Sequence, residues 1–153
     1  MVKTTFGDKQ MKILVSDCLL GNNCRYCADN CKNQAVLDLG KKYQIIGVCP
    51  EQVGGLATPR PPAERVGDKI IAKTGVDVTA EYTKGAQVAL QLAKDNQIAF
   101  AVLKSKSPSC GKGLIYDGTF TGGKVEGNGV TAELLLKNGF VVYTEEELSQ
   151  IDL

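Results

Sequence analysis

Three cysteines in this chain occupy the same kind of place in the sequence. Each follows a short apolar run and precedes a loop that contains glycine or proline. They are Cys18, Cys49 and Cys110. The carboxyl ends of parallel strands meet at one edge of an open α/β sheet, which is where such folds bind ligands. We therefore expect these three thiols to converge.

Converging thiols form a soft, sulfur-rich site that suits iron–sulfur clusters, zinc or copper. The chain has six cysteines and no histidine, and six cysteines in a reducing compartment indicate metal binding or catalysis rather than crosslinks. Structural zinc usually takes four ligands, whereas three cysteines on a four-iron cluster leave one iron open for a substrate. Because the chain has no histidine, any acid–base catalysis must use carboxylates, hydroxyls, lysine, tyrosine or thiols.

A second cysteine motif, Cys24-x2-Cys27-x3-Cys31, resembles half of a zinc site. No second half follows, so several interpretations stay open. The thiols could pack against the first helix or exchange disulfides, could add a ligand to the main site, or could hold zinc in a non-catalytic module that binds a partner. A metal-free enzyme that uses one thiol as a nucleophile or in thiol exchange is a further alternative.

Two other features carry weaker signals. Gly111-Lys112-Gly113 lacks the rest of a phosphate-binding loop and the helix that must follow it, so it does not predict a phosphate site. Arg60 lies among prolines. We expect a solvated side chain there rather than a substrate clamp, although a guanidinium group can bind planar acceptors with two parallel hydrogen bonds.

The elements that must position these residues are indicated by alternating apolar runs and helical patterns. Four apolar runs predict short strands, at Lys12–Ser16, Tyr43–Val48, Ile98–Leu103 and Phe140–Tyr143. Helical periodicity covers residues 78–95 and 130–137. Asn30 is a candidate N-cap for a first helix that ends near Gly40.

This alternation predicts a single three-layer, Rossmann-like α/β domain with about four mostly parallel strands. A small edge hairpin is expected over residues 66–73. The proline-rich loop over residues 56–63 follows Cys49, and we expect it to form a wall of the site. The glycine-rich segment 111–129 predicts a loop or an irregular hairpin beside the same site.

Length and charge set the wider expectations. Residues 11–153 are expected to form one domain, and residues 1–10 a flexible N-terminal extension. The net charge of +1 gives no electrostatic case for nucleic acid or membranes as partners. No apolar stretch approaches the ~20 residues of a membrane span. Since the first residues also lack the apolar core of a signal peptide, we expect a cytoplasmic protein.

Several of these segments together resemble the 2-thiouracil desulfurase family of small bacterial proteins. The matching segments are Ser16–Tyr26, Cys49–Glu64, Leu103–Gly113 and Ile115–Phe120. They occur in order and span nearly all of residues 12–143. One departure follows the first segment, because the relatives continue with Asp-Gly where this chain has Cys27-Ala28.

The resemblance implies a [4Fe–4S] cluster as the cofactor of a desulfurase. In that family three cysteines hold the cluster, and its free iron takes the sulfur of a thiolated pyrimidine such as 2-thiouracil, which becomes the oxo base. Carried over by motif, the implied cluster ligands are Cys18, Cys49 and Cys110. The implied partner is therefore a small-molecule thiolated pyrimidine.

The resemblance also implies a catalytic carboxylate and a catalytic serine. By motif these are Glu51 and Ser107, with Ser105 and Ser109 as alternatives for the serine. Attack of water on the ring carbon needs a base, and general bases supply a large part of such rate enhancements. We expect Glu51 to be that base and Ser107 to donate a hydrogen bond to the ring.

Overall fold

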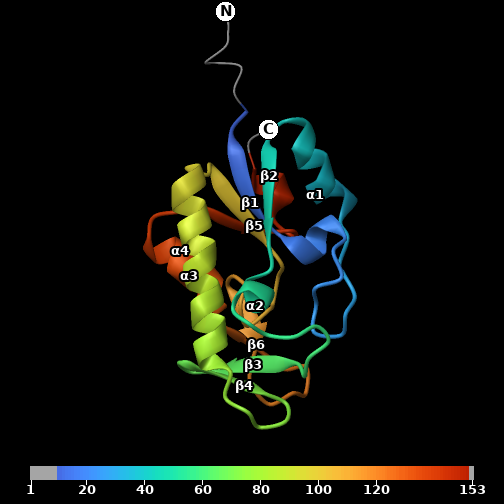
Figure 1. Cartoon of the computed structure of the whole chain (residues 1–153), viewed down its shortest axis with the longest axis vertical. Coiled ribbons are helices and arrows are strands. Elements are labelled where there is room, and N and C mark those ends of the chain that lie inside the picture. The colour runs from blue at the N-terminus through green and yellow to red at the C-terminus, as the bar shows by residue number, and fades with distance from the viewer. Residues whose placement is uncertain (1–9, 152–153) are drawn as a thin grey trace, which may run out of the picture.

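The centre of the protein is a four-stranded parallel sheet. The structure is a computed structural model and describes residues 10–151, so the expected extension over residues 1–10 falls almost wholly outside the described residues. The strand order is β2-β1-β5-β8 (Figure 1). The strands are β1 (Lys12–Ser16), β2 (Gln44–Val48), β5 (Phe100–Leu103) and β8 (Val142–Thr144). All four predicted strands are confirmed, and every pair of neighbours is parallel.

Helices cover both faces of this sheet, which confirms the three predicted layers. The long helix α3 (Thr79–Asn96) and α4 (Val130–Lys137) lie on one face, and α1 (Gln34–Asp38) lies on the other (Figure 1). The shorter elements are α2 (Pro50–Val53) and the 3₁₀ turns η1 (Asp17–Leu20), η2 (Leu39–Lys41) and η3 (Leu148–Gln150). Within the described part of the chain, no helix is both long enough and apolar enough to cross a bilayer.

The apolar strands divide their side chains between two cores. In β1, Ile13 and Val15 pack in a cluster with Val36 of α1. Leu14, which lies between them in the chain, packs in a second cluster with Ala89 of α3. Successive side chains of a strand point to opposite faces. Because both faces are covered, the strands are continuous apolar runs rather than alternating ones.

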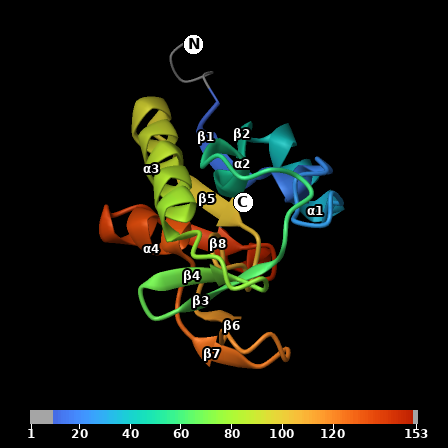
Figure 2. The same cartoon turned by 60° about the horizontal axis from the view of Figure 1, so that its bottom comes forward.

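Two antiparallel hairpins lie at the carboxyl ends of the parallel strands. They consist of β3 (Ala63–Val66) with β4 (Lys69–Ala72), and β6 (Leu114–Tyr116) with β7 (Lys124–Glu126) (Figure 2). The first is the predicted small hairpin, and it forms a two-stranded sheet of its own instead of joining the edge of the central sheet. The second is the irregular hairpin expected in the glycine-rich segment.

The first helix begins later than its predicted N-cap. Asn33, not Asn30, caps α1, and its side chain accepts a hydrogen bond from the backbone N–H of Val36 at 3.1 Å. The chain before it is held away from helical geometry, because the backbone N–H of Cys31 donates to the carbonyl oxygen of Cys18 at 2.9 Å. An asparagine can cap a helix only where the following residues are free to turn.

Helix α2 lies against α3 without any side chain between the two backbones. A Cβ atom at Gly85 of α3 would lie only 1.9 Å from the carbonyl oxygen of Pro50. At Gly54, just after α2, a Cβ atom would lie 2.1 Å from the carbonyl oxygen of Glu81. These two glycines therefore set how α2 is placed over the end of the sheet.

This contact predicts that Gly85→Ala destabilises the protein. In an exposed helix the same change is stabilising by about 1 kcal/mol, because alanine favours the helix. Here the added methyl group must push α2 away, and overpacking of this kind costs about 1–3 kcal/mol. The free energy of unfolding in urea, followed by far-UV circular dichroism, shows whether Gly85→Ala lowers or raises the stability. Thr83→Ala, at an exposed position of the same helix, is the matched control and should not destabilise. A Gly85→Ala protein as stable as the parent would contradict the packing described here.

Candidate active site

A cavity of about 330 Å³ opens at the carboxyl ends of the central strands. This volume lies within the range of small-molecule binding sites in proteins. Its lining includes the sequence-predicted residues Cys18, Cys49, Cys110, Glu51 and Ser107, together with Cys24. The structure thus brings together, in one cavity, every site residue expected from the sequence.

Each of the three predicted cysteines comes from the end of a different strand. Cys18 lies in η1 directly after β1, Cys49 follows β2 and precedes the first turn of α2, and Cys110 lies in the loop after β5. All three are buried. The parallel register places the ends of β1 and β2 side by side, with Ser16 opposite Val48. The expected convergence therefore follows from the strand pairing.

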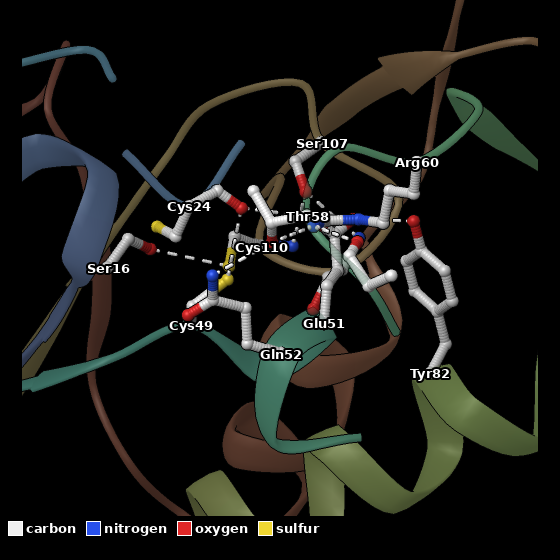
Figure 3. A network of polar contacts seen from close by, with 12 residues as sticks. Ser16, Cys24, Cys49, Glu51, Gln52, Thr58, Arg60, Tyr82, Ser107 and Cys110 are labelled. Carbon is white, nitrogen blue, oxygen red and sulfur yellow. Dashed lines mark hydrogen bonds and ion pairs between the residues drawn. The ribbon is translucent and has the colours of Figure 1, made fainter. Parts of the chain in front are cut away.

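Cys24 is a fourth thiol at the same place. It is only 4% exposed, and its thiol is a near neighbour of those of Cys18 and Cys49. Its carbonyl oxygen also accepts a hydrogen bond from the thiol of Cys49 at 3.7 Å (Figure 3). Of the open interpretations of the second motif, the one that brings a thiol to the main site agrees with this position of Cys24.

The rest of that second motif diverges from the site. Cys27 is exposed, and Cys31 is half-buried against the core cluster beside α1. Within residues 10–151, no three histidine, cysteine, aspartate or glutamate side chains are placed to hold a single metal ion. The spacing of the motif therefore does not correspond to a preformed zinc site.

The donor set of the cavity fits an iron–sulfur cluster. Four buried thiols share the cavity, and cysteine thiolates are the usual ligands of such clusters. The cluster contains several metal ions and is wider than one ion, so its ligands need not surround a single point. Soft thiolates match its preference for ligands.

The thiols of Cys24 and Cys110 stay protonated when no metal is bound. The hydrogen bond with Cys18, followed by burial, raises the pKa of Cys24 to about 12, although the hydrogen bond with Cys49 opposes it. Burial raises the pKa of Cys110 to about 12 against the hydrogen bond from Ser16. Metal ligands must lose their protons on binding, so loading of this site should release protons.

The carboxylate of Glu51 is held by two partners from distant segments. Arg60 makes an ion pair with Oε1, and the hydroxyl of Tyr82 donates to Oε2 at 2.5 Å (Figure 3). Arg60 also donates to the carbonyl oxygen of Cys24 at 2.9 Å and to Oγ1 of Thr58 at 2.9 Å. The pair thus joins α2, the proline-rich loop and α3 at one point.

Arg60 corrects one expectation from the sequence. Its side chain is only 5% exposed, so the predicted solvated arginine is wrong. Burial of a guanidinium group is tolerated because Glu51 supplies the opposite charge. Burial lowers the pKa of Arg60, but the Glu51 carboxylate outweighs it and the net pKa is raised, so the charge persists. Arg60 is not among the residues that line the main cavity, and it acts on Glu51 rather than as a substrate clamp.

Tyr82 is a site residue that sequence reasoning missed. In the sequence it is one apolar position of the helical pattern of α3, and nothing local distinguishes it from a core residue. Burial, followed by the charge of Glu51, raises the pKa of Tyr82, so its hydroxyl remains a hydrogen-bond donor. The residue lines the cavity beside Glu51.

Ser107 differs from the two serines that were its alternatives. Its Oγ accepts hydrogen bonds from the backbone N–H groups of Ser109, at 3.0 Å, and Cys110, at 2.9 Å. Ser105 already donates its hydroxyl to Glu145 at 2.8 Å, and the hydroxyl of Ser109 pairs with that of Thr131 at 2.8 Å. Ser107 therefore keeps a hydroxyl proton for a ligand while it shapes the loop around Cys110.

The loop that carries Cys110 is packed from two sides. The hydroxyl of Ser16 donates to the sulfur of Cys110 at 3.3 Å (Figure 3). On the other side, a Cβ atom at Gly129 would lie 2.4 Å from the carbonyl oxygen of Ser109, so α4 starts directly against the loop backbone. The backbone N–H of Thr131 donates to that carbonyl oxygen at 2.8 Å.

The motif loops contain two aspartates, Asp17 and Asp117. Asp17 lines the cavity, and burial raises its pKa although a hydrogen bond with Asn22 opposes this. Asp117 accepts hydrogen bonds from the backbone N–H of Thr119 at 3.0 Å and from its hydroxyl at 2.6 Å. It is not among the lining residues, so of the two aspartates only Asp17 lies at the cavity.

Comparisons with known proteins identify the family of this chain. Residues 13–147 match the family model described as 2-thiouracil desulfurase. The uncharacterized protein YbbK of Bacillus subtilis (strain 168) is 42% identical over 149 residues, which cover 91% of this chain and 99% of that protein. A solved structure of the [4Fe-4S]-dependent thiouracil desulfidase TudS is 44% identical, with a TM-score of 0.87 and coverage of 92% of this chain and 95% of that one. The chain therefore belongs to the 2-thiouracil desulfurase family.

Proposed function

We propose that this protein is an iron–sulfur-dependent desulfurase that removes the sulfur of a thiolated pyrimidine such as 2-thiouracil and yields the oxo base. The observation that carries the proposal is the meeting of three strand-end cysteines with Glu51 and Ser107 in one cavity. The solved relative is described as a [4Fe-4S]-dependent thiouracil desulfidase, at 44% identity over 92% of this chain.

The cofactor site consists of Cys18, Cys49 and Cys110. A [4Fe–4S] cluster held by these thiolates supplies an iron without a protein ligand, which acts as a soft Lewis acid towards the substrate's sulfur. Cys24 adjoins this set, while its carbonyl oxygen is bonded to Arg60 and Cys49. Through this carbonyl oxygen Cys24 orients Arg60 and Cys49, while the three ligands assigned here are Cys18, Cys49 and Cys110.

Glu51 takes the role of general base. In the overall reaction a water oxygen replaces sulfur on the ring carbon, and both protons of the water leave with the sulfide. Glu51 accepts the first proton as the water attacks, and it later passes that proton on. Arg60 pairs with one oxygen and Tyr82 donates to the other, so the carboxylate is held in one orientation.

Ser107 orients the substrate. Two backbone N–H groups already donate to its Oγ, so the remaining proton must be donated outwards. Because Ser107 lines the cavity, we propose that its hydroxyl donates a hydrogen bond to an acceptor atom of the pyrimidine ring. A donor fixed in this way costs little reorganisation during the reaction.

The cofactor assignment predicts about four irons per chain after anaerobic reconstitution, as a [4Fe–4S] cluster requires. Serine is a poorer ligand than cysteine for soft metals, so Cys18→Ser, Cys49→Ser and Cys110→Ser should each lose or cripple the cluster. Iron analysis and the broad visible absorbance of the cluster measure this. Cys24→Ser and Cys27→Ser are the controls and should load normally. A chain that binds one zinc tightly and refuses iron would contradict the assignment, as would desulfurase activity without metal.

The base assignment predicts that Glu51→Gln keeps the cluster but slows turnover by ~10²–10⁴-fold, the usual contribution of general acid–base catalysis. The amide has the same shape and can still accept from Tyr82, so the cluster should load. The charge of Arg60 is left uncompensated, however, and the free energy of unfolding should fall. Gln52→Ala, on the next residue of α2, should leave sulfide release unchanged. Full activity of a loaded Glu51→Gln protein would remove this residue from the mechanism and transfer the role to Asp17.

The substrate is tested by an anaerobic panel of thiolated pyrimidines, their nucleosides and thiolated tRNA. Released sulfide and the oxo product are both quantified. We expect turnover of the free thiolated base, because the cavity has the size of a small-molecule site. Turnover of thiolated tRNA with none of the free base would overturn the small-molecule assignment.

A further inference from the structure

The turn between β6 and β7 borders the cavity and contains a residue in a costly backbone conformation. Phe120 lines the cavity, and its φ angle is +58°. Bulky side chains rarely adopt this left-handed region, in which glycine is unstrained. Strain of this kind persists only where the surroundings impose it, and it is concentrated at functional sites.

Glu64 accepts hydrogen bonds from the backbone of this turn and helps to hold it in this conformation. It lies in β3, far from the turn in sequence, and is only 9% exposed. Its Oε1 accepts hydrogen bonds from the backbone N–H groups of Gly118, at 2.9 Å, and Phe120, at 3.1 Å. A buried carboxylate is tolerated only when it is well hydrogen-bonded. Both of these bonds go to the backbone of the turn.

Two further contacts restrict the same turn. The carboxylate of Asp117 accepts hydrogen bonds from the backbone N–H of Thr119 at 3.0 Å and from its hydroxyl at 2.6 Å. Gly118 packs against β3, where a Cβ atom would lie 2.5 Å from Cγ2 of Val66. Figure 2 shows the β6–β7 hairpin beside β3 and β4. The position of Phe120 is therefore determined by several independent contacts.

The chemistry of the cavity indicates what this aromatic side chain is for. In the proposed function, the thiol site, Glu51 and Ser107 all act on atoms at the edge of the substrate's planar ring. These atoms are its sulfur and its polar atoms. None of these protein groups provides an apolar surface for the face of the ring. An aromatic side chain at the border of the cavity supplies such a surface, and stacking of a base on an aromatic residue contributes substantially to binding.

We propose that Phe120 stacks on the face of the substrate's pyrimidine ring, and that Glu64 is the positioning residue that holds it there. The inference rests on the proposed function and deepens it. It assigns contact with the face of the ring to the β6–β7 turn, while Ser107 binds an atom at the edge of the ring and the cysteines and Glu51 serve the sulfur chemistry.

The first test is Phe120→Ala, with two measurements. The KM for 2-thiouracil should rise by about 5- to 150-fold, the range for loss of one aromatic–base stack, while the absorbance of the cluster stays unchanged. Binding of uracil, the oxo product, should weaken to a similar extent in calorimetry. An unchanged KM and unchanged uracil binding would overturn the inference, as would a loss confined to kcat.

A second test separates strain from packing. Phe120→Gly should be more stable to urea than Phe120→Ala, because glycine accepts the left-handed backbone, yet it should bind uracil no better. Ala28→Gly is the matched control, since Ala28 has a similar φ of +62° and does not line the cavity. It should raise stability without any effect on KM. A Phe120→Gly protein less stable than Phe120→Ala would show that strain is not stored at this residue.

The positioning role of Glu64 is tested by coupling. Glu64→Leu removes the acceptor and should raise the KM as Phe120→Ala does, whereas Glu64→Gln retains an acceptor oxygen and should restore most of the affinity. In the double variant Glu64→Leu/Phe120→Ala the two effects should not add, because both act through one ring. Full additivity would overturn the role of Glu64.

The inference and the proposed function fail in different ways. If the loaded parent protein releases sulfide from no thiolated pyrimidine, the proposed function is wrong and the inference falls with it. If the parent turns over 2-thiouracil and Phe120→Ala keeps the parent's KM, the inference alone is wrong.

Discussion

The site depends on one buried ion pair, between Glu51 and Arg60. It joins α2, which follows Cys49, to the proline-rich loop, and through the hydroxyl of Tyr82 it reaches α3. Arg60 further binds the carbonyl oxygen of Cys24. Removal of one partner from a buried pair leaves an uncompensated charge, at a cost of about 3–5 kcal/mol. The interaction that orients the proposed base therefore also holds the cysteine-bearing segments together.

A second set of charges restrains the loop that carries Ser107 and Cys110. Three lysines of this loop pair with three consecutive glutamates after β8, in the pairs Lys104–Glu145, Lys106–Glu146 and Lys112–Glu147. Glu145 also accepts from the backbone N–H of Ser105 at 2.8 Å. Half-exposed ion pairs contribute little one by one, but together with the start of α4 they leave the loop few alternative conformations. This pairing also occupies Lys112, the lysine of the glycine–lysine–glycine segment.

The sheet and the placement of three cysteines were predictable because they depend on local patterns. Continuous apolar runs such as Ile98–Leu103 form strands wherever both faces of the sheet are buried, and the predicted runs correspond to β1, β2, β5 and β8. Parallel pairing then brings the strand ends together whatever the details of the loops. The first helix was placed less well, since the choice between Asn30 and Asn33 as its cap depends on a backbone contact from Cys31 to Cys18.

The sequence by itself determined the family resemblance, the strands and the meeting of Cys18, Cys49 and Cys110 at one edge. Only the tertiary structure decided that Cys24 turns into the site while Cys27 remains exposed, that Arg60 is buried, and that Tyr82 and Glu64 serve the cavity. The physical reason is the same in each case. A polar or charged side chain can be buried only where a partner meets it. The partners here come from segments that the fold, and not the local sequence, brings together.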